Sequence, residues 1–156
     1  VPETLARTTL GSWRAGTRIN LEPALTPSTP LGGHFVLGHA DGTCTVADVR
    51  TLGQGEGREL RLVIPEAFRH YFAYKGSVTL SGVSLTVAAL EADGIRIAVI
   101  PHTLSETTLG GVKAGDTLNF EADVLAKYVE RIATGRRGNG EGGLREGALR
   151  EWGYAV

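Results

Sequence analysis

Sulfur is scarce in this sequence, which contains no methionine and a single cysteine, Cys44. One cysteine cannot form a disulfide within the chain, and such scarcity is typical of proteins from a reducing compartment. Cys44 lies in the apolar run GTCTV, so we expect a small buried side chain and not a reactive thiol. These features predict a cytoplasmic protein without a disulfide framework.

An excess of one charge and long apolar runs are also lacking. The chain carries 16 basic and 17 acidic residues, for a formal net charge of −1. Nothing in this balance favours binding to nucleic acid or to an anionic membrane. No apolar run approaches the roughly 18 residues that a membrane-spanning helix requires. We therefore expect neither a nucleic-acid partner nor a membrane-embedded segment.

One stretch of the sequence occurs twice. Residues 2–25 and 101–124 are identical at 11 of 24 aligned positions without a gap, and both contain PxTLxxTTLG. So large an offset indicates two copies of a unit of about 100 residues, a common domain size. A chain of 156 residues holds only one whole copy. Because it also starts at Val1 and lacks methionine, we expect the C-terminal part of a longer two-module protein.

Short β-type runs fill the region from residue 32 to residue 124. Glycine is frequent, at 22 residues, and pairs such as Ser81-Gly82 and Asp93-Gly94 separate the runs. Six or seven strands in about 90 residues are typical of a small closed barrel or sandwich. The predicted strands cover residues 34–40, 44–49, 59–64, 77–82, 83–90, 95–100 and 117–124.

Two short helices are predicted between these strands. The segment 65–72, PEAFRHYF, opens with Pro65, which suits the first position of a helix. Thr103 and Glu106 form a capping-box pattern before a short helical turn that stops at Gly110. The repeated motif therefore predicts a strand end, a capped short helix and a glycine stop.

The hydrophobic period changes after Asp123. Leu125, Val129 and Ile132 share one helical face, with Asp123 as the expected N-cap. This apolar stripe either packs on a partner subunit or folds back onto the same barrel. The glycine-rich residues 135–143 predict a flexible linker. A last amphipathic helix is expected through Leu144, Ala148, Leu149 and Trp152.

The most unusual stretch is GGHFVLGHADG, residues 32–42. His34 and His39 are five positions apart, so on a strand they point to opposite faces, and no cysteine or acidic ligand set joins them. A metal site is therefore disfavoured. The glycines, including Gly38, indicate a bulge or a close backbone approach, either to a ligand or to another strand.

Residues 75–87, KGSVTLSGVSLTV, alternate hydroxyl and apolar side chains. By period two, Ser77, Thr79 and Ser81 share one face of a strand, and Ser84 and Thr86 share one face of the next. Such hydroxyls either ring a small polar ligand or simply face solvent. No nucleophile elbow or phosphate-binding loop is present.

Several motifs in this order resemble the riboflavin synthase family of the α-chain type. They are GGHFVLGHADG, YKGSVTLSGVSLTV, IPHTLSETTLG, GDTLNFEADVLAKYVER, and the leading PETLARTTLG with GTRINLEPAL. The resemblance implies an all-β fold: a six-stranded Greek-key β-barrel with short helices and a C-terminal helix. It implies that residues 1–31 are the remnant of an N-terminal lumazine-binding barrel and 32–124 the whole C-terminal barrel. Residues 125–134 would be the oligomerisation helix of a homotrimer, and 135–156 a flexible linker and tail.

The resemblance also implies an activity. The family converts two molecules of 6,7-dimethyl-8-ribityllumazine, by transfer of a four-carbon unit, into riboflavin and 5-amino-6-ribitylamino-pyrimidinedione. No metal or redox cofactor is implied, and lumazine synthase is suggested as a pathway partner. The alternatives are a lumazine- or flavin-binding protein without catalysis, and an inactive fragment with one ligand-binding barrel.

The family's site residues can be carried over position by position. The predicted catalytic residues are His39, Lys75, Ser84 and Asp123. The predicted substrate contacts are Gly38, Ala40, Ser77, Val78, Thr86, Ile100 and Thr103. Among them, His39 is the side chain best suited to proton transfer near neutral pH. His34 and His102 match no catalytic position, so structural roles are expected for both.

Overall fold

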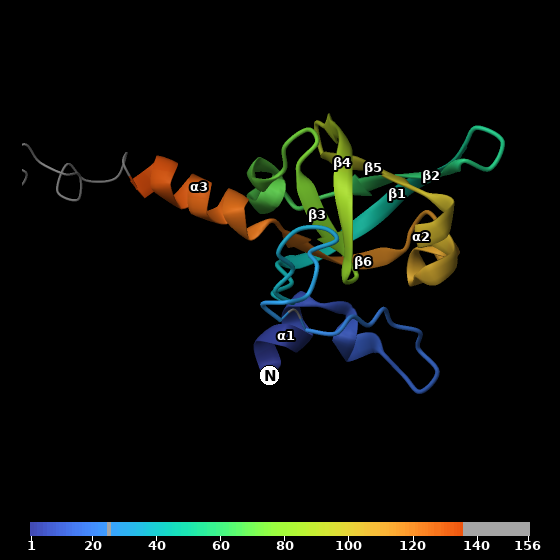
Figure 1. Ribbon diagram of the computed structural model, residues 1–156, viewed down its shortest axis with the longest axis horizontal. Helices are drawn as coiled ribbons and strands as arrows, with labels where there is room; N and C mark the ends of the chain where they lie inside the picture. The colour runs from blue at the N-terminus through green and yellow to red at the C-terminus, as the bar shows by residue number, and fades with distance from the viewer. Residues whose placement is uncertain (25, 136–156) are drawn as a thin grey trace, which may run out of the picture. The chain divides into compact units, whose positions relative to one another are not determined.

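The computed structural model describes residues 1–24 and 26–135, and the chain divides into two units, residues 1–124 and 125–156. The first unit is built around a closed barrel of antiparallel strands in the order β1-β2-β5-β4-β3-β6 (Figure 1). Strand β2 lies beside β5 of the β3–β4–β5 meander, which is a Greek-key connection. The predicted all-β barrel with short helices is therefore confirmed.

Strand β1 closes the barrel by pairing with two neighbours. The strands are β1 (Gly42–Leu52), β2 (Gly57–Val63), β3 (Ser77–Leu80), β4 (Val83–Glu91), β5 (Gly94–Val99) and β6 (Thr117–Ala122). Gly42 in the first half of β1 lies opposite Phe120 of β6, and Leu52 in the second half lies opposite Gly57 of β2. The predicted Ser81-Gly82 turn joins β3 to β4, with φ of 45° and 84°. Two left-handed residues match the twist of a tight hairpin.

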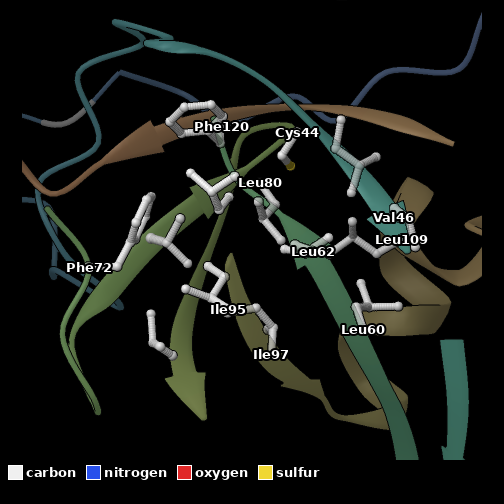
Figure 2. Close-up of a cluster of buried hydrophobic side chains, with 14 of the residues drawn as sticks. Cys44, Val46, Leu60, Leu62, Phe72, Leu80, Ile95, Ile97, Leu109 and Phe120 are labelled. Carbon is white, nitrogen blue, oxygen red and sulfur yellow. The ribbon is translucent and has the colours of Figure 1, made fainter. Parts of the chain in front are cut away.

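Aliphatic and aromatic side chains from every strand fill the barrel (Figure 2). In β1, Cys44 and Val46 are buried between outward-facing neighbours, as strand pleating requires. A bulge after Val46 shifts this alternation, so that Val49 packs against the core. Each large side chain buried here stabilises the fold by about 1.5–3 kcal/mol.

The described part of the chain also contains six helical segments. They are α1 (Pro2–Arg7), η1 (Thr9–Ser12), η2 (Glu66–Tyr71), α2 (Pro101–Glu106), η3 (Thr108–Gly111) and α3 (Val124–Gly135), where η denotes a 3-10 helix. The helix predicted at 65–72 is the 3-10 helix η2, and Pro65 is its N-cap and not its first residue. Phe68 of η2 packs edge-on against Phe120, with ring centroids 5.3 Å apart. Segment η2 therefore covers part of the barrel core.

The strand predicted at 34–40 is wrong, because these residues form an irregular segment. The barrel is already closed by the pairing of β1 with β6, so it offers no free edge for another strand. Residues 34–41 attach instead through individual hydrogen bonds to side chains and to the end of β6.

The capping box predicted at Thr103 and Glu106 is also wrong. Helix α2 starts earlier, at Pro101, and has no side-chain cap. Proline favours the first turn of a helix because it lacks the amide hydrogen that would be unsatisfied there. Thr107 is the residue that caps: its hydroxyl accepts from the Leu109 amide of η3 and donates to the Thr103 carbonyl at 2.6 Å.

Helix α3 begins directly after Asp123 and extends the predicted 125–134 helix by one residue at each end. Its apolar side chains are 57–66% exposed: Leu125, Tyr128, Val129 and Ile132. The rest of the predicted linker and the predicted helix at 144–152 lie outside the described residues. Among residues 1–24 and 26–135, no helix combines the length and apolarity needed to cross a bilayer.

Candidate functional site

The segment 33–41 lies over the outer side of the barrel and is anchored on β6. The Leu37 amide donates to Oε1 of Glu121 at 2.9 Å, and Oδ2 of Asp41 accepts from the Ala122 amide at 2.8 Å. Glu121 is only 5% exposed. A buried carboxylate requires such partners, since an unpaired one would be costly. The anchors therefore hold the segment in a defined position.

His34 bridges two hydroxyl groups on neighbouring strands. Its Nδ1 lies 2.8 Å from Ser84 Oγ on β4, and its Nε2 lies 3.2 Å from Thr79 Oγ1 on β3. Thr79 and Ser84 are directly paired, so one imidazole can reach both. A neutral imidazole has one donor and one acceptor nitrogen, and each hydroxyl can take either role. His34, expected to be structural, therefore belongs to the candidate site.

Glycine allows this close approach. A Cβ atom at Gly33 would overlap Ser84 Oγ, whereas one at the preceding Gly32 would meet nothing within 4 Å. The close approach predicted from the glycines is thus to Ser84, at Gly33. Gly38 has a different requirement: its φ of 75° lies in the left-handed region, with open space around it.

Four hydroxyl residues occupy one face of the β3–β4 hairpin. Ser77 pairs with Thr86, and Thr79 pairs with Ser84. Directly paired residues point to the same side, and a spacing of two keeps both pairs on one face. Ser84 and Thr86 are exposed, whereas Thr79 is 3% exposed. Val78 is buried in the core on the opposite side, so only its backbone can reach a ligand here.

Three further predicted residues lie near the ends of β3 and β5. Lys75 adopts a left-handed conformation just before β3; its amide donates to the Val87 carbonyl, and its ammonium lies 5.4 Å from the Tyr74 ring centroid. Ile100 directly follows β5, which pairs with β4, and is 59% exposed. Thr103 lies in α2 and is half-buried.

The remaining predicted residues are more dispersed. His39 is exposed on the 33–41 segment, and Asp123 is half-buried between β6 and α3. The structure brings Ser77, Ser84 and Thr86 together. The histidine in contact with Ser84 is His34 and not His39.

A groove of about 960 Å³ lies near these residues, between residues 9–20 and the barrel. Thr79 lines it, as do Gly38 and Ala40, the only predicted substrate contacts that do so. The groove and the hydroxyl face therefore share Thr79 but are otherwise distinct. The hydroxyl face is the better candidate for binding a small polar ligand, because it brings together Ser77, Ser84 and Thr86.

Among the described residues, neither a cysteine nucleophile nor a metal site is supported. Burial raises the pKa of the Cys44 thiol from 9.0 to about 12, so this cysteine is protonated at neutral pH and a poor nucleophile. Within residues 1–24 and 26–135, no three His, Cys, Asp or Glu side chains are grouped to hold a metal ion. The groups that the hydroxyl face and the 33–41 segment offer to a ligand include hydroxyls, imidazoles and backbone amides.

Fold and site together define the class: a closed six-stranded antiparallel barrel with a hydroxyl-rich outer face beside a Gly-Gly-His segment. A family model described as "Lumazine binding domain" matches residues 37–123. The chain belongs to this family.

Curated relatives are riboflavin synthases. The chain is 42% identical over 130 residues to the enzyme of Photobacterium phosphoreum (83% of this chain, 59% of that protein). It is 42% identical over 133 residues to that of Mycobacterium tuberculosis (83% and 65%) and 36% identical over 132 residues to that of Bacillus subtilis (85% and 60%). The chain thus spans less than two thirds of the length of these relatives.

Solved structures of similar fold include those of LumP. The complex with 6,7-dimethyl-8-(1'-D-ribityl) lumazine matches with a TM-score of 0.67 and 21% identity, over 78% of this chain and 64% of LumP. The complex with riboflavin matches with a TM-score of 0.65 and 25% identity, over 77% and 64%.

Proposed function

We propose that this chain is the lumazine-binding part of a riboflavin synthase, and that it takes part in the dismutation of two 6,7-dimethyl-8-ribityllumazine molecules. The products are riboflavin and 5-amino-6-ribitylamino-pyrimidinedione. The observation that carries the proposal is the open hydroxyl face of β3–β4 beside Gly33 and His34. This face lies within the part of the chain that is similar to riboflavin synthases.

The hydroxyl face suits the chemistry of this ligand. A ribityl chain and a pteridine edge offer many hydrogen-bonding groups and one flat apolar surface. Ser77, Ser84 and Thr86 supply hydroxyls that both donate and accept. Ile100, exposed after β5, supplies an apolar wall, with Thr103 beside it. Backbone groups of Val78, Gly38 and Ala40 complete the predicted contacts.

The reaction requires positioning and proton transfer. The 7-methyl group of the lumazine is already acidic, because its carbanion is delocalised into the ring. The protein therefore mainly holds two substrates face to face. His39 transfers the proton of the 7-methyl group, and Ser84 contacts the ring. Asp123 and Lys75 orient the reacting groups or balance their charge. His34 is a positioning residue, since it fixes the Ser84 hydroxyl.

The proposal also covers assembly. A dismutation needs two bound substrates, so a second barrel is required, and residues 1–31 are the end of such a barrel. In support, Ile19 and Leu21 are 44% and 86% exposed, whereas Leu118 and Phe120, their counterparts in the second copy, are 6% and 1% exposed. The α3 face forms a homotrimer, the protein works in the cytoplasm, and lumazine synthase is its pathway partner.

A second candidate function is lumazine or flavin binding without catalysis. The similarity in fold to LumP supports this candidate. Both candidates predict binding, and only the first predicts turnover.

The deciding experiment mixes the chain with 6,7-dimethyl-8-ribityllumazine and follows riboflavin by absorbance, with ligand fluorescence as a binding signal. Riboflavin formation that Ser84→Ala slows supports the enzyme. A fluorescence change without riboflavin supports the binding protein or a half-site, and adding an N-terminal barrel from a relative distinguishes these two. No change in either signal would refute both candidates.

A further inference from the structure

Residues 2–13 and 101–112 have closely similar backbone conformations, and the similarity in sequence continues to residues 24 and 123. Each consists of a short α-helix, a threonine cap and a 3-10 helix. The capping threonines have nearly identical dihedrals: φ −127° and ψ 167° at Thr8, φ −128° and ψ 167° at Thr107. Each hydroxyl donates to the carbonyl four residues earlier at 2.6 Å. Residues 2–13 thus reproduce a surface segment of the barrel, and residues 1–24 as a whole are called the arm below.

The arm and the barrel exchange equivalent hydrogen bonds. The Thr108 amide of the barrel donates to Oδ1 of Asn20 at 2.8 Å, and the Thr9 amide of the arm donates to Oδ1 of Asn119 at 2.8 Å. Thr9 corresponds to Thr108 in the repeat, and Asn20 corresponds to Asn119. A contact in which i meets j and j meets i is the signature of a two-fold axis.

We propose that the barrel surface formed by Ser81, Thr108 and Asn119 is a docking surface for a second copy of the same barrel, and that the arm covers it. The surface binds the arm, residues 2–13 of the arm copy residues 101–112, and Asn20 makes the bond that corresponds to that of Asn119. The same surface therefore fits residues 101–123 of an identical barrel. In the symmetric pair, Asn119 of each copy accepts from the Thr108 amide of the other.

The groove is consistent with this occupant. Asn20 also donates from Nδ2 to the Ser81 carbonyl at 2.7 Å, at the tip of the β3–β4 hairpin. The arm has no β-hairpin of its own, so it offers Asn119 no carbonyl equivalent to that of Ser81. Asn119 instead lines the groove of about 960 Å³. A second barrel would supply its own Ser81 and Gly82 there.

The tethered arm competes with a second copy. A short tether gives an effective concentration in the millimolar range, so the arm dominates at micromolar protein. Weakening the arm should therefore expose the surface. Asn20→Ala removes three hydrogen bonds that the arm makes and leaves the barrel surface intact. Asn119→Ala also loosens the arm, but it removes the acceptor needed for docking.

These two variants form a matched pair for sedimentation velocity on the full chain. We expect Asn20→Ala to raise the association constant about tenfold or more over the parent chain, given the usual worth of such hydrogen bonds. Asn119→Ala and the double variant should show no increase. Equal association of Asn20→Ala and the parent, or of Asn119→Ala and Asn20→Ala, would overturn the proposal. Association through α3 is common to all of these chains and cancels in the comparison.

A second measurement does not depend on weakening the arm. A nitroxide is placed at Gly111→Cys, a groove position whose Cβ meets no atom within 4 Å. This chain is mixed at high concentration with ¹⁵N-labelled chain that carries no nitroxide. Broadening of the Ser81 and Thr108 amide signals in the ¹⁵N chain supports docking at this surface. Broadening elsewhere, or none, contradicts it.

Discussion

Glycine 33 sets the distance between the 33–41 segment and strand β4. A methyl group at this position would overlap Ser84 Oγ, so Gly33→Ala should displace His34 and cost about 1–2 kcal/mol of stability. Gly32→Ala is the matched control, because its new methyl group would lie in open space. Denaturant unfolding and lumazine fluorescence titration would compare the two. Equal ligand affinity in both variants would show that the segment does not shape the binding face.

His34 and His39 should behave differently when replaced. His39 is exposed, so His39→Ala should slow riboflavin formation by about tenfold or more while leaving the unfolding midpoint unchanged. His34→Ala removes two hydrogen bonds, one of them to the buried Thr79, and should cost about 1 kcal/mol or more of stability. Turnover measured beside thermal unfolding separates the two roles. A normal rate for His39→Ala would exclude it as the proton-transfer group.

Cys44 predicts a particular dependence of stability on pH. Its pKa is raised from 9.0 to about 12 by burial, so the folded chain keeps this proton where the unfolded chain loses it. The stabilisation is therefore fully present below about pH 9 and declines as the pH rises toward 12. Cys44→Ala should lack this component. Urea unfolding of both chains between pH 8 and about pH 11 tests it, and parallel curves would refute it.

Residue-level prediction succeeded where partners are close in sequence. Ser77 and Thr79 could be placed on one face of a strand, and Ser84 and Thr86 on one face of the next, because period two fixes both. That the two sets share a face required the register of the hairpin. His34 could not, since its partners Thr79 and Ser84 are 45 and 50 residues away. The available signal was the glycine pair directly before it, which indicated a close approach without naming the surface.

At the level of elements, alternation and turn residues were sufficient to predict six strands. The seventh, at 34–40, has a similar apolar pattern but no edge to join, and the closure of a barrel is not visible in any local window. The bulge after Val46 is likewise a product of the closed sheet. The threonine cap was misplaced because Pro101 starts α2 earlier than the capping-box pattern indicates.

The pairing of β2 with β5 depends on glycine at one position. Gly94 lies opposite Val63, and a Cβ atom there would overlap the Leu62 carbonyl. Gly94→Ala should therefore destabilise the barrel by at least about 2 kcal/mol, since the obstacle is backbone and cannot rotate away. Gly111→Ala, in open space on η3, is the control. Similar unfolding free energies for the two variants would contradict the close approach.

At the scale of the whole molecule, the exposed face of α3 predicts the assembly state. Val129 and Ile132 are 66% and 59% exposed, and we expect them to be covered in the proposed trimer. Val129→Asp should dissociate the trimer, because a charge at a buried interface is costly. Arg131→Gln changes the net charge equally and should leave the mass unchanged. Light scattering would measure both, and a trimeric Val129→Asp chain would contradict the assignment.

The repeat could be read from the sequence, but not how its first copy is held. Leu10 and Leu21 are 38% and 86% exposed, which agrees with the proposal that residues 1–31 are the end of a further barrel. The paired bonds of Asn20 and Asn119 required coordinates, because no local pattern reveals that two copies of a motif face each other. The function was predicted from the family resemblance. The composition disfavoured nucleic-acid and membrane partners but identified no ligand.

The double pairing of β1 also governs the order in which the chain can fold. The contacts of β3 with β4 and of β4 with β5 are local, whereas Gly42 pairs with Phe120, from the first strand to the last. Distant pairings form late, because loop-closure entropy must be overcome first. On the ribosome, the barrel therefore cannot close until β6 has left the exit tunnel. Until then, both edges of the incomplete sheet are open to other chains, so the interval before β6 emerges is when this barrel most needs protection from aggregation.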